Sequence, residues 1–352
     1  MEPILMDTGI NADVKPIQLN RLVQQIGNTL IKPIYFVIQG KVRKVYLKLE
    51  GANPTGSVKD RTGYALIHNL EERGVLREGS VVIESTSGNL GVALAFICQA
   101  RGYGFIAVVD PKTTSENIAK MHALGAQVDI VDQPDATGGY LLSRLARVQE
   151  LHQQYAHYVW TDHSSNSSNP AIHYSSTGPE IYRQMNGKVD TVFVAVSTGG
   201  TLTGIGRFFR EVSPATRVIG VDARGSVVFD APPAPRKLTG IGSSRRSSFI
   251  STEIYDSHTL VGDEEAFTFC RALHSATGIK VGGSSGAVLS ACARYLYDHL
   301  EMTNVVCVCS DSGENYTSSI FNDEWLQQQG LHLSQNQLGS VSDILHTMSR
   351  YW

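Results

Sequence analysis

The stretch SVVIESTSGNLGVALAFICQARGYGFIAVVD, residues 80–110, combines several patterns in a short length of chain. A run of apolar, mostly β-branched residues leads into a loop of serine, threonine and glycine. A longer apolar segment and a second β-branched run follow. Short apolar runs separated by a helical segment are typical of parallel strands that are covered on both faces. The stretch therefore predicts a strand, a loop, a helix and a strand, which is the repeating unit of an α/β fold.

The same alternation continues in both directions along the 352 residues. Upstream, VYLKLE (45–50) precedes the helical pattern TGYALIHNLEERG (62–74), and downstream DTVFVAVS (190–197) is again strand-like. We predict an α/β fold with two mainly parallel sheets, each lying between layers of helices. Two segments rich in turn residues, 164–170 and 231–248, are predicted to be loops.

Composition excludes several classes of protein. The 30 basic and 33 acidic side chains are interleaved and leave a net charge of -3, which argues against nucleic acid binding. The five cysteines have no metal-binding spacing, and an odd number is typical of a reducing compartment. No signal-like start and no run of about 20 apolar residues is present. We therefore expect a cytoplasmic protein without a metal ion, a membrane span or a nucleic acid partner.

Clusters of serine, threonine and glycine follow four predicted strands. Ligands of open α/β sheets bind at the carboxyl ends of strands, and the N–H groups of a following helix favour an anion there. In the second cluster, Gly199 and Gly200 allow the backbone to close around a phosphate, and the hydroxyls of Ser197, Thr198 and Thr201 add donors. The four clusters are ESTSGNLG (84–91), VSTGGTLTG (196–204), GGSSGA (282–287) and CSDSGENY (309–316).

Lys59 lies in the loop NPTGSVKDR, residues 53–61. A phosphate-binding loop together with a loop lysine permits two chemistries, nucleotide binding or a Schiff base to pyridoxal phosphate. The nucleotide motifs G-x-x-x-x-G-K-[ST] and G-x-G-x-x-G are absent. Pyridoxal phosphate requires a lysine that is distant in sequence from the phosphate loop, which is the arrangement of Lys59 and residues 197–201.

In this order and spacing, the segments NPTGSVKDR, TSGNLG, STGGTLTG, GGSSGA and SGENY resemble the fold type II pyridoxal phosphate enzymes of the cysteine synthase and cystathionine β-synthase group. The resemblance implies a tryptophan synthase β-like fold with two three-layer αβα domains. It implies a large cofactor-binding domain (18–57 and 161–325), a smaller mobile substrate domain (58–160) and a C-terminal extension (326–352). It also implies a homodimer that acts on small amino-acid substrates.

The resemblance assigns roles to residues of the first two motifs. Lys59 is implied to be the Schiff-base lysine and the base of the reaction, and Ser87 to assist catalysis. Asn89 is implied to bond the ring hydroxyl of the cofactor. Ser85, Thr86, Ser87 and Asn89 are implied to bind the substrate carboxylate. The loop that contains them is expected to close over the substrate, with movement of the substrate domain or of the 231–248 loop.

The later motifs are implied to hold the rest of the cofactor. The residues implied to bind the cofactor phosphate are Ser197, Thr198, Gly199, Gly200 and Thr201. The pyridine nitrogen has two candidate partners, Ser312 first and Ser284 second. A neutral hydroxyl at this place leaves the nitrogen unprotonated, which favours β-elimination over chemistry that needs a full carbanion.

Arg144 interrupts an apolar helical face. If GGYLLSRLARVQEL (138–151) is helical, a period of 3.6 residues puts Arg144 on the stripe of Leu141, Leu145, Val148 and Leu151. An arginine in such surroundings is rarely unpaired. One interpretation is a buried ion pair with an Asp or Glu. The other is binding of a substrate phosphate, because guanidinium presents a planar fork to phosphate oxygens.

Further segments resemble one branch of the group, the synthases that join O-phospho-L-serine to L-glutamate on the way to 2,3-diaminopropionate and siderophores such as staphyloferrin B. The resemblance implies that Arg144 corresponds to the arginine that binds phosphoserine in that branch, and that Ser197 corresponds to a second residue that contacts phosphoserine. The segments are VVDPK (108–112), QPDATGGYLLSRLARVQEL (133–151), VDARGSVVF (221–229) and LTGIGSSR (238–245).

Two residues of the predicted substrate pocket depart from this pattern. Ser164 replaces a tyrosine of that branch, and His163, which could donate to the substrate carboxylate, replaces a glutamine typical of the group. We expect a ping-pong β-replacement that uses O-phospho-L-serine and L-glutamate. The alternatives are an enzyme that uses O-acetylserine or another nucleophile, a β-elimination lyase, or a non-enzymatic binding protein.

Overall fold

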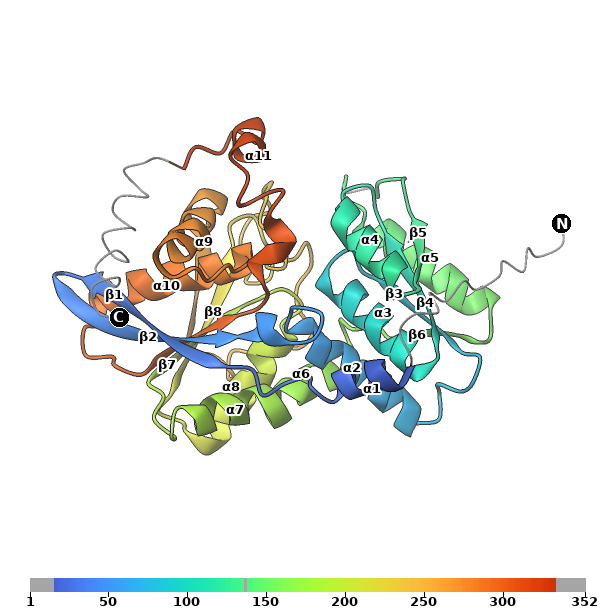
Figure 1. Cartoon of the computed structure of the whole chain (residues 1–352), viewed down its shortest axis with the longest axis horizontal. Helices are drawn as coiled ribbons and strands as arrows, with labels where there is room; N and C mark the ends of the chain where they lie inside the picture. The colour runs from blue at the N-terminus through green and yellow to red at the C-terminus, as the bar shows by residue number, and fades with distance from the viewer. Residues whose placement is uncertain (1–15, 136–137, 334–352) are drawn as a thin grey trace. The chain divides into compact units, whose positions relative to one another are not determined.

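The structure, a computed structural model, describes residues 16–135 and 138–333 (Figure 1). The chain divides into two compact units. Unit 1 contains Met1–Ile26 and Lys59–Asn166, and unit 2 contains Gly27–Val58 and Ser167–Trp352. The predicted domain boundaries and the predicted mobility of the smaller domain stay predictions. Of the predicted C-terminal extension, residues 334–352 lie outside the described part of the chain.

Unit 1 is built around a parallel sheet with the strand order β5-β4-β3-β6. Ser85 at the end of β3 pairs with Val108 of β4, and Ile83 pairs with Trp160 of β6, so the carboxyl ends of these strands meet at one edge of the sheet. The elements are α1 (Pro16–Val23), α2 (Lys59–Glu72), β3 (Val81–Ser85), α3 (Asn89–Arg101), β4 (Gly104–Val109), α4 (Ser115–Ala123), β5 (Gln127–Ile130), α5 (Leu141–Gln154) and β6 (Tyr158–Trp160).

Helices cover both faces of this sheet. Val82 of β3 belongs to a core cluster with Phe96 of α3, whereas the next residue, Ile83, packs with Val148 and Leu151 of α5. Successive side chains of a strand point to opposite faces, so a strand buried on both sides must be apolar throughout. The apolar run VVI of the 80–110 stretch meets this requirement.

Unit 2 contains a sheet with the strand order β1-β2-β10-β7-β8-β9. β1 and β2 are antiparallel, and the other neighbouring strands pair in parallel. The strands are β1 (Ile31–Ile38), β2 (Lys41–Leu49), β7 (Thr191–Ala195), β8 (Arg217–Ala223), β9 (Ser257–Val261) and β10 (Val305–Cys309). The helices and helical turns are η1 (Glu50–Ala52), α6 (Ser168–Ile172), η2 (His173–Thr177), α7 (Gly178–Gln184), α8 (Gly200–Val212), α9 (Asp263–Thr277), α10 (Gly283–Asp298), η3 (Gly313–Tyr316) and α11 (Asp323–Gln328).

This sheet also lies between two helical layers, and Figure 1 shows α9 and α10 together beside it. Phe193 of β7 packs in a core cluster with Phe267 of α9 and Val288 of α10. Val194, the next residue, packs instead with Phe209 of α8. The predicted α/β fold with two mainly parallel sheets is therefore confirmed.

One loop prediction was partly wrong. The 164–170 segment was predicted to be irregular because it is rich in turn residues, yet α6 begins at Ser168. Pro170 does not prevent this helix, because it lies in the first turn, where the missing N–H has no partner within the helix. The predicted loop at 231–248 contains no helix or strand. No helix in the described part of the chain is long and apolar enough to cross a bilayer.

Candidate active site

The loop between β3 and α3 contains four residues predicted to bind the substrate or the cofactor. Ser85 ends β3 and Asn89 begins α3. The Ser85 Oγ is buried and makes no hydrogen bond to any described residue. Gly88, the N-cap of α3, has no side chain that could accept a hydrogen bond from the first N–H groups of this helix. A buried hydroxyl beside an uncapped helix N-terminus suits a carboxylate or phosphate oxygen.

Glu84, immediately before this loop, was not predicted as a functional residue. It is almost fully buried, and its carboxylate accepts hydrogen bonds from Ser85 N (2.8 Å), His163 N (3.0 Å) and Thr161 Oγ1. Burial raises the pKa of the Glu84 carboxyl, but the charge and hydrogen bonds of His163 and the bond from Thr161 outweigh burial, so its pKa is below the usual value. The sequence did contain a signal for Glu84, because it is an acidic residue in a strand that is otherwise largely apolar.

His163 and Ser164, both predicted substrate residues, follow β6. The Nδ1 of His163 lies 3.2 Å from Glu84 Oε1, and Ser164 Oγ lies 3.4 Å from His163 Nε2. Because β3 and β6 are parallel neighbours, the segment after β6 lies at the same edge of the sheet as the loop after β3. The structure thus brings His163 and Ser164 to the loop of Ser85.

Arg144 lies on the buried face of α5, as the helical period predicted. Its side chain is 12% exposed, and its Nε lies 3.4 Å from Oδ2 of Asp110, the residue after β4. The ion pair of the first interpretation is therefore present. Nevertheless, Nε and Nη1 are buried and make no hydrogen bond within the described chain. Burial lowers the pKa of Arg144, and the charges of Asp110 and Glu84 oppose that effect.

The predicted phosphate loop connects β7 to α8 in unit 2. Gly199 is the N-cap of α8 and has a φ of 91°, and Gly200 is the first residue of that helix. A Cβ on Gly200 would lie 2.1 Å from Asn169 Oδ1, and a Cβ on Gly199 would lie 2.4 Å from Ser247 Oγ. Both positions therefore require glycine. The loop ends at the N-terminus of a helix long enough to favour an anion.

Residues from distant parts of unit 2 fix the shape of this loop. Ser197 Oγ donates to Gly242 O at 3.0 Å, and Gly242 N donates to Val196 O at 2.7 Å. Ser247 Oγ donates to Thr198 O. Gly242 and Ser247 both lie in the predicted 231–248 loop. Their contact with the predicted phosphate loop could not be predicted from the sequence. The contacts show that the irregular segment supports the loop.

The NPTGSVK segment is attached to the end of β10. Val58 N donates to Ser310 O at 2.8 Å, and Ser312 N donates to Gly56 O at 3.0 Å. Gly56 has a φ of 90°, a conformation that favours glycine. These bonds anchor the segment up to Val58, the residue before Lys59. Lys59 itself is the first residue of α2 in unit 1.

The two candidates for the pyridine nitrogen occupy different positions in unit 2. Ser312 caps η3, where its Oγ accepts a bond from Glu314 N at 3.3 Å. It lies at the carboxyl end of β10, next to β7 and therefore at the same sheet edge as the phosphate loop. Ser284 is buried in the first turn of α10. The preference for Ser312 stays a prediction.

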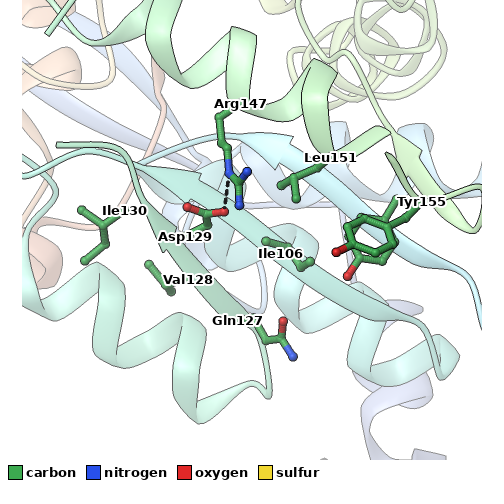
Figure 2. Close-up of a pocket in the computed structure, with 9 residues that line it drawn as sticks. Ile106, Gln127, Val128, Asp129, Ile130, Arg147, Leu151 and Tyr155 are labelled. Carbon is green, nitrogen blue, oxygen red and sulfur yellow. Dashed lines mark hydrogen bonds and ion pairs between the residues drawn. The ribbon is translucent and has the colours of Figure 1, made fainter. Parts of the chain in front are cut away.

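Figure 2 shows a surface hollow of about 450 Å³ in unit 1, between α5 and the edge strand β5. Arg147 and Asp129 pair across it at 2.9 Å. None of the residues predicted for the site lines it. Arg147 and Arg144 therefore differ in their surroundings although they lie on the same helix, since Arg144 contacts Asp110 instead.

Comparisons with known proteins agree with this geometry. The family model described as pyridoxal-phosphate dependent enzyme matches residues 22–311. The N-(2-amino-2-carboxyethyl)-L-glutamate synthase of Ralstonia nicotianae is 37% identical over 328 residues, which cover 93% of this chain and 97% of that protein. The enzyme of the same name from Cupriavidus metallidurans is 37% identical over 311 residues, or 87% and 91% of the two chains.

Two solved structures are also similar to this chain over most of its length. A hydrogen sulfide-producing enzyme from Fusobacterium nucleatum is 30% identical, with a TM-score of 0.78, and the match covers 84% of this chain and 98% of that chain. O-ureido-L-serine synthase is 28% identical, with a TM-score of 0.78, and the match covers 87% and 98%.

The chain belongs to the pyridoxal-phosphate dependent enzyme family. It is a pyridoxal phosphate enzyme of the cysteine synthase type, a group of β-replacement synthases. The residues present fit the cofactor, because Gly199 and Gly200 have no room for a side chain and form a backbone loop at a helix N-terminus, as a bound phosphate requires.

Proposed function

We propose that this enzyme joins O-phospho-L-serine to L-glutamate, giving N-(2-amino-2-carboxyethyl)-L-glutamate and phosphate, in the biosynthesis of 2,3-diaminopropionate, siderophores or other secondary metabolites. The Cβ–O bond of phosphoserine breaks and a bond forms between Cβ and the glutamate nitrogen. The phosphate leaves with the bonding electrons, and the glutamate amine loses one proton. Two relatives at 37% identity that carry the name of this synthase support the proposal.

The observation that best supports the proposal is that Arg144 is mostly buried but incompletely hydrogen-bonded. Its guanidinium is mostly buried, yet two of its nitrogens lack hydrogen bonds within the described chain, and its contact with Asp110 at 3.4 Å is long for a charged pair. Leaving buried charged donors unsatisfied costs more than an ordinary lost hydrogen bond. A phosphate group has oxygens enough to satisfy these donors. This arrangement favours a phosphorylated donor substrate over an acetylated one.

We assign the other steps to residues that the sequence motifs predict for the site. Bound pyridoxal phosphate supplies the electron sink that permits proton loss at Cα and departure of the group on Cβ. Lys59 takes the Cα proton, and the Ser85–Asn89 loop binds the substrate carboxylate. Thr198, Gly199, Gly200 and Thr201 bind the cofactor phosphate through backbone N–H groups and hydroxyls, and Asn89 bonds the ring hydroxyl.

Replacing Arg144 tests the choice of donor. Arg144→Ala is expected to raise the KM for O-phospho-L-serine by an amount equivalent to roughly 1.5–3 kcal/mol, the cost of a lost hydrogen bond to a charged group. Any activity with O-acetyl-L-serine should change little, because that donor has no phosphate. Steady-state kinetics with the two donors measures both effects.

Arg147→Ala is the matched control, since it removes the same side chain from the same helix but breaks a partly exposed pair with Asp129. It should leave both KM values unchanged. If Arg144→Ala impairs both donors equally and lowers the melting temperature, Arg144 is a structural partner of Asp110 and the phosphoserine proposal loses its main support.

The nucleophile needs a separate experiment, because no residue described above selects it. We propose to incubate the enzyme with O-phospho-L-serine and a mixture of amines, amino acids and sulfide, and to identify the products by mass spectrometry. L-glutamate should be incorporated. Cysteine as the main product would favour the cysteine synthase alternative, and pyruvate with ammonia would favour a lyase. A homodimer and a cytoplasmic location stay predictions.

A further inference from the structure

Ser85 is the last residue of β3, and the alternation of side chains along that strand decides which face of the unit 1 sheet it occupies. Ile83, two residues earlier, packs with Val148 of α5. Val108, which pairs with Ser85 on β4, belongs to the same cluster. Val82 packs instead with α3 on the opposite face. The Ser85 side chain therefore points to the face of the sheet that α5 covers.

Arg144 of α5 lies over the same face, at the carboxyl edge of the sheet. It precedes Val148 by four residues, so the two side chains are on one side of the helix. Its contact with Asp110 places it at the end of β4, because Asp110 directly follows that strand. Neighbouring strands are only about 4.8 Å apart, so the ends of β3 and β4 put Ser85 and Asp110 at adjacent points of this edge.

Ser85 and Arg144 both have donors that the described chain does not use. Ser85 is 5% exposed, and its Oγ makes no hydrogen bond to any described residue. The same holds for Nε and Nη1 of Arg144. Asp110 approaches the guanidinium through Nε, while its other oxygen, Oδ1, accepts from Lys112 N at 2.9 Å. Buried donors without acceptors cost free energy, and an anion with several oxygens satisfies both side chains.

We propose that Ser85 is a substrate-binding residue whose hydroxyl donates, together with Arg144, to the phosphate of an O-phosphorylated donor. The inference rests on the proposed function, because only a phosphorylated donor brings this group to the site. It separates Ser85 from the later residues of the loop, 86–89, which keep the predicted role of binding the substrate carboxylate. The oxygens of a phosphate point in several directions, so one accepts from the hydroxyl while others accept from the guanidinium.

Ser85→Ala tests the role of the hydroxyl in donor selection. The KM for O-phospho-L-serine should rise about tenfold or more, because a hydrogen bond to a charged group is lost. Any KM for O-acetyl-L-serine should change little. The melting temperature of the free enzyme should not fall, because the hydroxyl has no partner among the described residues to lose. Ser87→Ala should raise both KM values, since both donors have a carboxylate.

Ser80→Ala is the matched control, because it removes a buried serine hydroxyl at the opposite end of β3. Ser80 Oγ accepts from Arg77 N at 2.9 Å, so this hydroxyl does have a partner within the chain. The substitution should lower the melting temperature and leave both KM values unchanged. The two serines thus separate a hydroxyl that stabilises the fold from one that binds a ligand.

Binding of inorganic phosphate tests the same site without turnover. The full-length enzyme is titrated with its pyridoxal phosphate bound, so that the cofactor already fills the predicted phosphate loop of unit 2, and calorimetry measures the affinity for inorganic phosphate. Ser85→Ala and Arg144→Ala should each weaken this affinity, and Ser80→Ala should not. An affinity in Ser85→Ala equal to that of the wild type would overturn the proposal.

The outcomes separate the inference from the proposed function. If no donor is turned over while Ser85→Ala weakens phosphate binding, the proposed function fails and Ser85 keeps its role in binding a phosphate group. If O-phospho-L-serine is turned over and Ser85→Ala raises the KM of both donors equally, the hydroxyl binds the carboxylate and the inference alone is refuted. Should Ser85→Ala not fold, Ser85→Cys replaces it, because a thiol is only a weak donor and fills the same position.

Discussion

In the proposed mechanism, Lys59 is the residue on which the chemistry depends most. It directly follows a segment whose backbone is bonded to the end of β10 through Val58 and Gly56, and it begins α2. A lysine that forms a covalent bond to the cofactor and then acts as a base needs a fixed backbone, because both tasks depend on position. The two hydrogen bonds of the preceding segment provide that fixed point.

Lys59→Ala should therefore abolish turnover without unfolding the protein. Loss of the base alone reduces rates by roughly 10²–10⁴-fold, and loss of the covalent attachment adds to this. The absorption band of the bound cofactor should shift and turnover should vanish, while the melting temperature stays near that of the wild type. Lys112→Ala, which removes an exposed lysine of the same unit, should be fully active. Substantial activity in Lys59→Ala with pyridoxal phosphate added would exclude the assigned role.

At the scale of elements, the shape of the predicted phosphate loop between β7 and α8 depends on the side chains that pack against it. Gly200 begins α8, and Asn169 of α6 occupies the space that a side chain would need. Asn169 is buried and its Nδ2 lies 3.4 Å from Thr198 Oγ1, so it cannot move aside without disturbing the loop. The helix N-terminus and its support thus form one tightly packed group.

Gly200→Ala should weaken binding of pyridoxal phosphate at least tenfold, or about 1.4 kcal/mol, because the loop must shift to make room for the methyl group. Overpacking should also destabilise the fold by about 1–3 kcal/mol. Titration of the apoenzyme with cofactor and a thermal melt measure the two effects.

Gly102→Ala is the control for backbone strain, because Gly102 has a φ of 78° and an added methyl group would meet no neighbouring side chain or backbone within 4 Å. It should lower stability without changing cofactor affinity. Equal loss of affinity in both variants would mean that general destabilisation, and not the shape of the loop, is responsible.

At the scale of the whole molecule, each unit has its own apolar core, and unit 2 joins segments that are far apart in the chain. Lys48 is one connection between these segments. It is fully buried on β2 and donates to Glu180 Oε2 of α7 at 2.7 Å and to Thr29 O at 2.8 Å. Removing one member of a buried pair leaves the other charge uncompensated.

Lys48→Met should accordingly lower the free energy of unfolding by about 3–5 kcal/mol in urea denaturation. Lys48→Met combined with Glu180→Gln should recover part of this loss, because the second change removes the unpaired charge. Lys41→Met, at an exposed position of the same strand, should have little effect. If Lys48→Met is as stable as Lys41→Met, the pair does not hold the segments together.

The sequence by itself was sufficient for the α/β fold and for the cofactor. Strands buried on both faces must be continuously apolar, and helices must alternate with them, so both leave local patterns such as VVIES and LGVALAFICQAR. The place of Arg144 on the buried face of α5 was also predictable, because helical periodicity is a local property. The 164–170 loop was the exception, since turn residues also occur in the first turn of a helix.

Only the tertiary structure decided which side chains meet. Glu84 and His163 are 79 residues apart, and the parallel pairing of β3 with β6 brings them into contact. In the same way, Arg144 meets Asp110 because α5 packs over the sheet, and Asn169 meets Gly200 because α6 packs against α8. No local pattern encodes such pairs. Strand order and helix packing arise from burial of the whole core, and the charged contacts that tune the site follow from them.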